Sequence, residues 1–263
     1  MTRSVVGLDL DGVLWRGTRP VDGSARAVAA LRDAGVEVAF LTNNANPTIG
    51  DYVTKMAGMG IDTAPGEIVT SAQAAARLLE RELVVGDRVH VCGGPGLVEA
   101  VSERGLTVVT GPPASAVVVG YDPGFDYEAL DRASAAVRDG ALFVATNVDA
   151  TFPSGDRLLP GNGALVAAVA AAGGAAPEVA GKPEAPYADL VRERFGPTGV
   201  MVGDRPSTDG ALADVLGWPF ALVLSGVAGS DGEEPVPEPA PSYLADDLAA
   251  LVPVLLDAFA RPT

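Results

Sequence analysis

The stretch Val5-Val6-Gly7-Leu8-Asp9-Leu10-Asp11-Gly12-Val13 decides how the chain is interpreted. Its apolar start predicts a buried strand over residues 5–10. Residues two apart on a strand point the same way, so Asp9 and Asp11 project together from the strand tip. Like charges held this close need a cation or a shared proton, and Mg²⁺ prefers such hard oxygen ligands. Gly12 permits a tight bend. The alternative is a simple strand-to-turn transition, where Asp and Gly are common.

Two further polar segments follow predicted strands. Leu41-Thr42-Asn43-Asn44 offers a hydroxyl, amides and backbone N–H groups that can hold phosphate oxygens without adding charge. Gly181-Lys182-Pro183 offers the positive charge that an acidic protein needs to attract phosphate. A polar loop and a lysine in a surface turn are the structural alternatives. Both segments follow predicted strands, and the ends of parallel strands are where an open α/β sheet binds ligands.

A fourth segment, Gly203-Asp204-Arg205-Pro206-Ser207-Thr208-Asp209, follows the apolar run Val200–Val202. Asp204 can complete a carboxylate cage for Mg²⁺. Three roles are open for Asp209: a second metal ligand, an outer-shell carboxylate that orients the ligands, or a helix N-cap. We favour an outer-shell carboxylate that also caps the following helix.

The rest of the chain alternates β-branched runs with alanine-rich stretches, which predicts an α/β fold with a parallel sheet. A capping box of Thr48 and Asp51 opens one of the helices. Strands are expected at 5–10, 36–42, 68–70, 88–92, 106–110, 116–121, 141–146, 178–180, 199–202 and 219–224. Helices are expected at 24–34, 49–59, 71–83, 97–104, 127–139, 163–172, 185–195, 209–215 and 244–259, with a loop at 235–241.

The bulk composition excludes several classes of protein. The chain of 263 residues has a formal net charge of −16, so nucleic acid and anionic membranes are not expected partners. One cysteine, Cys92, excludes an internal disulfide framework, and its apolar strand predicts a buried thiol. One histidine, His90, cannot make a multi-histidine zinc site. The N-terminus has no sustained apolar signal region, so we expect a cytoplasmic protein.

The four segments, in this order, resemble motifs one to four of the haloacid dehalogenase (HAD) superfamily, close to its class IIA-capped, NagD-like and 4-nitrophenylphosphatase-like branch. Further family-like stretches are Val119–Asp122, Ala145–Asp149 and Leu159–Gly163. One departure is Pro206-Ser207-Thr208-Asp209-Gly210, where many relatives have Leu-Asp-Thr-Asp-Ile. The aspartates still align, although Gly210 weakens the start of the next helix.

The resemblance implies a Rossmann-like HAD core with an inserted α/β cap domain. The core comprises residues 1–83 and 177–263, and the cap comprises residues 84–176. The cap acts as a lid and substrate-specificity element, and it is the expected surface of a possible homodimer. Tyr121, Asp122, Asn147 and Asp149 are candidates for shaping specificity, with a role in folding the cap as an equal alternative.

The resemblance also implies a mechanism. Asp9 attacks phosphorus to form an aspartyl-phosphate, and Asp11 is the general acid and then the general base. Mg²⁺ is held by the Asp9 carboxylate, the Asp11 main-chain carbonyl and Asp204. The phosphate is bound by Asp11, Thr42, the Asn43 backbone and Lys182, while Asn44 supports the loop.

We therefore expect a Mg²⁺-dependent phosphatase that acts on a small phosphorylated metabolite. Two alternatives stay open, a phosphomutase of the same fold and a non-hydrolytic phosphometabolite-binding regulatory protein. A long-lived phosphoacceptor is disfavoured because Asp11 supplies the base that destroys the intermediate. Glycerol phosphates, sugar phosphates, pyridoxal phosphate and phosphoglycolate are all open as substrates.

Overall fold

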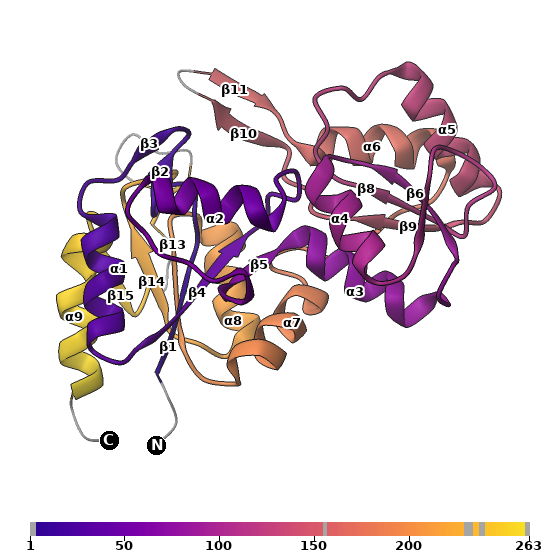
Figure 1. Ribbon diagram of the computed structural model, residues 1–263. Coiled ribbons are helices and arrows are strands. Elements are labelled where there is room, and N and C mark those ends of the chain that lie inside the picture. Colours follow the sequence, from indigo (N-terminus) through magenta and orange to yellow (C-terminus); the bar gives the residue numbers. More distant parts are fainter. Residues whose placement is uncertain (1–3, 155–156, 229–233, 237–239, 261–263) are drawn as a thin grey trace. The chain divides into compact units, whose positions relative to one another are not determined.

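The computed structural model describes residues 4–154, 157–228, 234–236 and 240–260 (Figure 1). Contacts between residues divide these into two compact units. Unit 1 takes the described residues within Met1–Thr42, Val53–Val69 and Ala188–Thr263, and unit 2 takes those within Asn43–Tyr52 and Thr70–Tyr187. None of the described helices is both long enough and apolar enough to cross a bilayer.

Unit 1 is built on a six-stranded sheet in the order β15-β14-β13-β1-β4-β5. Strand β1 lies between β13 and β4 and is parallel to both. Because both faces of a central parallel strand are covered, its residues are apolar throughout, as Val5, Val6 and Leu8 show. The strands are β1 (Val5–Leu8), β4 (Glu37–Thr42), β5 (Ile68–Thr70), β13 (Val200–Gly203), β14 (Phe220–Val223) and β15 (Tyr243–Ala245).

Helices cover both faces of this sheet. Helices α1 and α9 lie side by side on one face, and α8 lies on the other (Figure 1). A short antiparallel hairpin, β2 (Trp15–Arg16) and β3 (Arg19–Pro20), follows β1. The helices within unit 1 are α1 (Ser24–Asp33), α8 (Ala211–Leu216) and α9 (Leu248–Ala260), with a 3₁₀ turn η1 (Pro65–Glu67) and a π-helical turn η2 (Pro206–Gly210). Helices α2 (Ile49–Gly58) and α7 (Ala185–Phe195) have residues in both units.

Unit 2 has its own five-stranded sheet in the order β12-β9-β8-β6-β7, and every strand pair in it is parallel. Helices α5 and α6 pack together over an apolar cluster that includes Val117, Val119 and Phe143. The strands are β6 (Arg88–Cys92), β7 (Thr107–Val109), β8 (Ala116–Val119), β9 (Leu142–Ala145) and β12 (Glu178–Val179), and a hairpin adds β10 (Thr151–Ser154) and β11 (Arg157–Pro160). The helices are α3 (Ser71–Glu82), α4 (Pro95–Glu103), α5 (Tyr127–Arg138) and α6 (Asn162–Gly173).

The α/β class and the parallel sheets are confirmed, and the predicted strands and helices lie within a few residues of the observed ones, with one exception near the C-terminus. The helix expected at 244–259 is wrong at its start. Residues Tyr243–Ala245 form edge strand β15 beside β14, and the Asp247 carboxylate then accepts a hydrogen bond from Ala250 N at 2.8 Å. The predicted loop at 235–241 lies partly outside the described residues. The capping box is confirmed, since Thr48 N donates to Asp51 Oδ2 and Asp51 N donates to Thr48 Oγ1.

The lone histidine and cysteine lie together on β6. His90 Nδ1 accepts a hydrogen bond from Gly111 N at 2.7 Å, and its Nε2 lies 3.3 Å from Cys92 Sγ. Cys92 is buried, which confirms the predicted buried thiol, and burial raises the pKa of this thiol to about 12. Burial also lowers the pKa of His90 below its ordinary value.

This lowered pKa predicts a pH dependence of stability. The unfolded chain takes up the His90 proton first, at a pKa near 6.5, so stability is lost as the pH falls below about 6.5. We expect the free energy of unfolding of the wild type to drop by about 1 kcal/mol relative to His90→Gln between about pH 7 and pH 5. Urea unfolding of both proteins across this range checks it. Parallel curves for the two proteins would contradict the expectation.

Candidate active site

Three carboxylates meet at the carboxyl ends of β1 and β13. Asp9 directly follows β1 and Asp204 directly follows β13, and the strands are in register with Leu8 beside Val202. A hydrogen bond from Asp9 N to Val202 O, 2.9 Å long, extends this pairing to Asp9 itself. Asp209 comes from the turn η2. Each of the three offers one oxygen, and these oxygens all lie within 4.8 Å of one another.

Glycines make room for this group, which we call the carboxylate cluster. Gly12 has a φ of +84°, as expected for a tight bend, and a side chain on Gly12 or on Gly226 would collide with the Asp204 carboxylate. Asp204 Oδ2 also accepts a hydrogen bond from Val227 N at 2.6 Å. The loop after β14 thus fixes the Asp204 carboxylate, so a third strand, in addition to β1 and β13, contributes to the site. Sequence reasoning missed this loop, although Ser225 and Gly226 closely follow an apolar strand, the signal used for the other segments.

The expected capping role of Asp209 is wrong. Helix α8 begins at Ala211 with Gly210 as its N-cap and no side-chain cap. Asp209 lies instead in the five-residue turn η2, where its Oδ2 accepts a hydrogen bond from Arg205 N at 3.2 Å. Its Cβ and carboxylate pack where a side chain on Gly203 would have to lie. The turn therefore directs Asp209 back towards Asp204, and the choice between ligand and outer-shell group stays a prediction.

The carboxylate cluster fits Mg²⁺. All its donors are hard oxygens, and Asp204 and Asp209 are 4% and 1% exposed. Buried carboxylates this close repel one another unless a cation balances them. The Asp11 side chain, by contrast, is exposed and is not one of the three clustered carboxylates. Its main-chain carbonyl as a ligand stays a prediction.

We expect Asp204→Asn to raise the Mg²⁺ concentration needed for half-maximal activity by about 10- to 100-fold, because an amide oxygen is a weaker ligand than a carboxylate. A Mg²⁺ titration of activity checks this. Asp214→Asn, a change on helix α8 outside the cluster, is the matched control. An unshifted titration for Asp204→Asn would rule out this ligand assignment.

A second group of predicted residues meets in unit 2, around the side chain of Asn43. Asn43 Oδ1 accepts a hydrogen bond from Lys182 N at 2.7 Å, and Asn43 Nδ2 donates to Lys182 O at 3.1 Å. The amide therefore pairs with both backbone groups of Lys182. A side chain on Gly181 would collide with Thr146 O and Asn43 Oδ1, which explains the glycine before the lysine. Lys182 itself is only 4% exposed.

The Asn43 backbone is held as firmly. Asn43 O accepts hydrogen bonds from Ser71 Oγ at 2.5 Å and from Asn147 Nδ2 at 2.8 Å. Asn162, buried at the start of α6, donates to Asn147 O at 2.8 Å. Asp149 Oδ2 lies 3.4 Å from Asn43 Nδ2. Sequence reasoning did not find Ser71 or Asn162, because each is an ordinary residue for the start of a helix.

These contacts bear on the residues proposed to shape specificity. Asn147 and Asp149 bond to Asn43, which favours the structural alternative for both. Asp122 Oδ1 accepts a hydrogen bond from Gly124 N within an exposed turn. The Tyr121 ring packs edge-on against Phe152 of β10 at 5.0 Å between centroids. Specificity roles for all four residues stay predictions.

The remaining predicted residues lie on the loop between β4 and α2. Thr42 ends β4 and is buried. Asn44 Oδ1 accepts a hydrogen bond from Asn46 N at 3.0 Å, and Asn44 O accepts one from Tyr52 Oη at 3.1 Å. These bonds suit the supporting role expected of Asn44.

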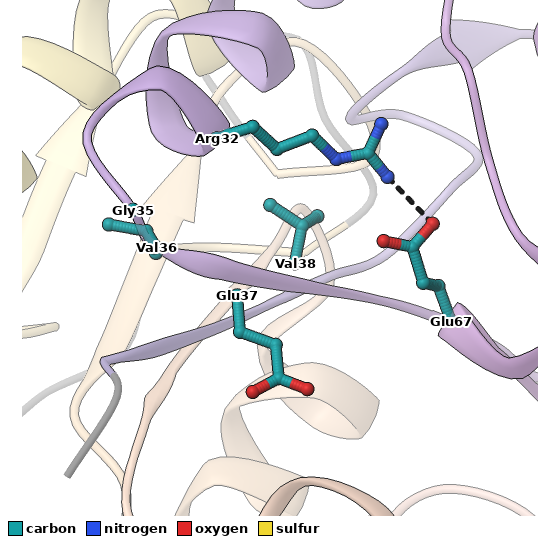
Figure 2. A pocket seen from close by; sticks show the side chains of 6 residues that line it. All are labelled: Arg32, Gly35, Val36, Glu37, Val38 and Glu67. Carbon is teal, nitrogen blue, oxygen red and sulfur yellow. Dashed lines mark hydrogen bonds and ion pairs between the residues drawn. The ribbon is translucent and has the colours of Figure 1, made fainter.

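A surface hollow elsewhere in unit 1 contains none of the predicted residues. Figure 2 shows Arg32 paired with Glu67 beside the start of β4, and the two groups are 2.7 Å apart. Because β4 is parallel to β1, this hollow lies at the opposite end of the sheet from the carboxylates. Arg32 also donates to Asp62 O. This arginine thus ties the loop 62–67 to α1, and the contacts indicate a structural role.

An oxygen-only cation site at the carboxyl ends of a parallel sheet is typical of α/β enzymes that transfer phosphoryl groups. Comparison with known proteins agrees. A family model of haloacid dehalogenase-like hydrolases matches residues 6–107, and a second, HAD-hydrolase-like model matches residues 179–251.

Individual relatives cover most of the chain. It is 36% identical to D-glycerol 3-phosphate phosphatase of Mycobacterium tuberculosis over 93% of this chain and 69% of that one. It is 38% identical to acid sugar phosphatase of Staphylococcus haemolyticus over 77% of this chain and 78% of that one. A crystal structure of the glycerol phosphate phosphatase of M. tuberculosis in complex with magnesium matches this chain with a TM-score of 0.85. The match has 35% identity and covers 95% of this chain and 76% of that one. A p-nitrophenyl phosphatase from Archaeoglobus fulgidus has a TM-score of 0.87 and 26% identity over 97% and 100%.

The chain therefore belongs to the haloacid dehalogenase-like hydrolases, as its motifs predicted. Within that family it is a phosphatase with Mg²⁺ as cofactor, which confirms the expected activity and metal. A small phosphorylated molecule is its substrate.

Proposed function

We propose that this phosphatase hydrolyses glycerol phosphate or a small sugar phosphate, with Asp9 as nucleophile. The observation that carries the chemistry is the carboxylate cluster, which holds Asp9 beside Asp204 and Asp209. The choice of substrate is supported by the relatives whose names specify glycerol 3-phosphate and sugar phosphates.

The proposed reaction has two half-reactions. Asp9 attacks phosphorus while Asp11 protonates the departing alkoxide, which leaves an aspartyl-phosphate. Asp11 then removes a proton from the water that hydrolyses the intermediate, because the second half-reaction needs the opposite proton transfer. When bound, Mg²⁺ screens the negative charge of the nucleophile and the phosphoryl group.

We further propose that Thr42, the Asn43 N–H and the Lys182 ammonium bind the phosphoryl oxygens. Negative charge spread over these oxygens calls for fixed dipoles and a cation. The paired hydrogen bonds from Asn43 to the Lys182 backbone support this role, because they fix the point from which the lysine stem starts. The side-chain amide of Asn43 is occupied in these bonds, so we assign the phosphate contact to its backbone N–H.

The expected division into a core of residues 1–83 and 177–263 and a cap of residues 84–176 stays part of this proposal. So do a homodimer through the cap, the absence of nucleic-acid and membrane partners, and a cytoplasmic location. Neither a phosphomutase nor a regulatory binding protein is favoured by the relatives described above, which are named as phosphatases.

A panel of phosphorylated metabolites tests the substrate proposal. Glycerol 3-phosphate, several sugar phosphates, pyridoxal phosphate and phosphoglycolate would be compared by kcat/KM at saturating Mg²⁺. We expect a glycerol or sugar phosphate to lead by about 10-fold or more. A leading value for pyridoxal phosphate or phosphoglycolate would contradict the proposal.

A further inference from the structure

The ammonium of Lys55 lies against the hairpin that follows the Asp9–Asp11 segment. The chain has 18 basic residues, but only two of them, Lys55 and Lys182, are lysines. Sequence analysis assigned no role to Lys55. It lies on α2, it is half-buried, and both it and the hairpin belong to unit 1.

Two contacts fix the Lys55 ammonium. Its Nζ lies 3.9 Å from the centroid of the Trp15 ring, and it donates a hydrogen bond to Gly17 O at 3.0 Å. A cation over an indole face is attracted by the ring quadrupole. Trp15 is fully buried, and its Nε1 has no hydrogen-bond partner among the described residues. The indole is therefore held by packing and by this cation, not by its own N–H.

Trp15 in turn holds the turn that bears Asp11. Gly12 N donates to Trp15 O at 2.6 Å, and Asp11 forms an isolated bridge with Trp15. The Asp11 side chain is itself exposed at this turn. The contacts therefore connect Lys55 through Trp15 to Gly12 and Asp11. They join distant parts of the sequence, since Lys55 and Gly17 are 38 residues apart.

Electrostatics supports the same connection. Burial lowers the pKa of Lys55 below its ordinary value, and the negative charge of Asp11 acts in the opposite direction. The negative charge of Asp11 therefore favours the protonated form of Lys55.

We propose that Lys55 is a positioning residue for proton transfer, which clamps the hairpin 15–20 so that the Asp11 carboxyl is directed at the leaving oxygen. The inference rests on the proposed function, because it assumes that Asp11 is the general acid. Lys55 need not touch the substrate for this role.

The leaving group of the substrate separates positioning from general damage. The alkoxide of glycerol 3-phosphate is a poor leaving group that needs a proton, whereas 4-nitrophenolate leaves readily without one. General acid catalysis is worth about 10²- to 10⁴-fold where the proton is needed. A misdirected Asp11 should therefore harm the alkyl substrate far more than the aryl one.

The test compares Lys55→Met and Lys55→Arg with the wild type on both substrates. For Lys55→Met we expect kcat/KM, which reports only the steps up to departure of the leaving group, to fall by about 10-fold or more on glycerol 3-phosphate and by less than about 3-fold on 4-nitrophenyl phosphate. Lys55→Arg should restore most of the loss, since a guanidinium also stacks on an indole and donates to a carbonyl. Equal losses on both substrates, no loss on either, or no rescue by arginine would overturn the proposal.

Matched variants keep the result interpretable. Arg19→Met removes one positive charge from the exposed strand β3 of the same hairpin, and it should leave the ratio of the two rates unchanged. If Lys55→Met does not fold, Lys55→Gln takes its place under the same criteria. Asp11→Asn gives the reference ratio. Equal losses in kcat/KM for Asp11→Asn on both substrates would refute the proposed acid itself, whereas equal losses in kcat/KM for the Lys55 variants alone would refute only the clamp.

Discussion

Asp9→Asn is expected to lower kcat on every phosphate ester by about 10³-fold or more, because an amide cannot attack phosphorus as a carboxylate does. This is the largest effect expected of a single side chain in the protein. The change is nearly isosteric, and Asp9 N still pairs with Val202 O, so the fold is retained. Steady-state kinetics on 4-nitrophenyl phosphate, with thermal unfolding as a check of the fold, measures it.

The matched control for that variant is Asp22→Asn, an exposed aspartate of unit 1 outside the carboxylate cluster. It makes the same chemical change and the same change in net charge, and its kcat should stay within about 2-fold of the wild type. If Asp9→Asn kept a similar rate, Asp9 would not be the nucleophile. Asp9→Ala guards against slow hydrolysis of the introduced amide.

Lys182→Met is expected to have the second-largest effect, a loss of about 10²- to 10³-fold in kcat/KM, because a fixed cation stabilises the charge that develops on the phosphoryl oxygens. Methionine keeps the volume of the stem at this buried position. The hydrogen bonds from Asn43 go to the Lys182 backbone, so they survive the substitution.

Two readouts sharpen the Lys182 experiment. Its Mg²⁺ titration should match the wild type, since no carboxylate of the cluster has changed. Arg138→Met, which removes an exposed cation at the end of α5, should leave kcat/KM nearly unaltered. Wild-type kinetics for Lys182→Met would show that the lysine is structural.

The meeting of Asp9 and Asp204 could be predicted from the sequence because each follows an apolar strand. In a parallel sheet such positions share one edge, and β1 and β13 turn out to be neighbours. The bend at Gly12 was predictable for a similar reason, since a carboxylate pair followed by glycine indicates a turn away from the site.

Asp209 shows where such reasoning stops. Its position before an apolar run is the usual one for an N-cap, and local sequence gives no sign of the π-helical turn that returns its side chain towards Asp204. The hydrogen bonds between Asn43 and Lys182 could not be predicted from the sequence either. The two are 139 residues apart, and the amide–backbone contact exists only once the chain has folded.

Lys55 is the third example. Its place on α2 predicts a solvated lysine on an amphipathic helix, and only the fold brings its ammonium to Trp15 and Gly17. Sequence motifs thus identified the groups proposed to do the chemistry. The residues that hold these groups in place, such as Ser71 and Val227, lie at the start of a helix and in a loop after another strand. No sequence motif marks these positions.

The most direct measurement asks which side chain carries the phosphoryl group during turnover. The enzyme would be quenched in acid while turning over 4-nitrophenyl phosphate, then treated with borohydride, which reduces an acyl phosphate to an alcohol. If Asp9 is the nucleophile, the peptide mass spectrum will show homoserine in place of aspartate at position 9 and nowhere else. Homoserine at another aspartate, or an unmodified Asp9 in an enzyme shown to accumulate a phosphorylated intermediate, would contradict it.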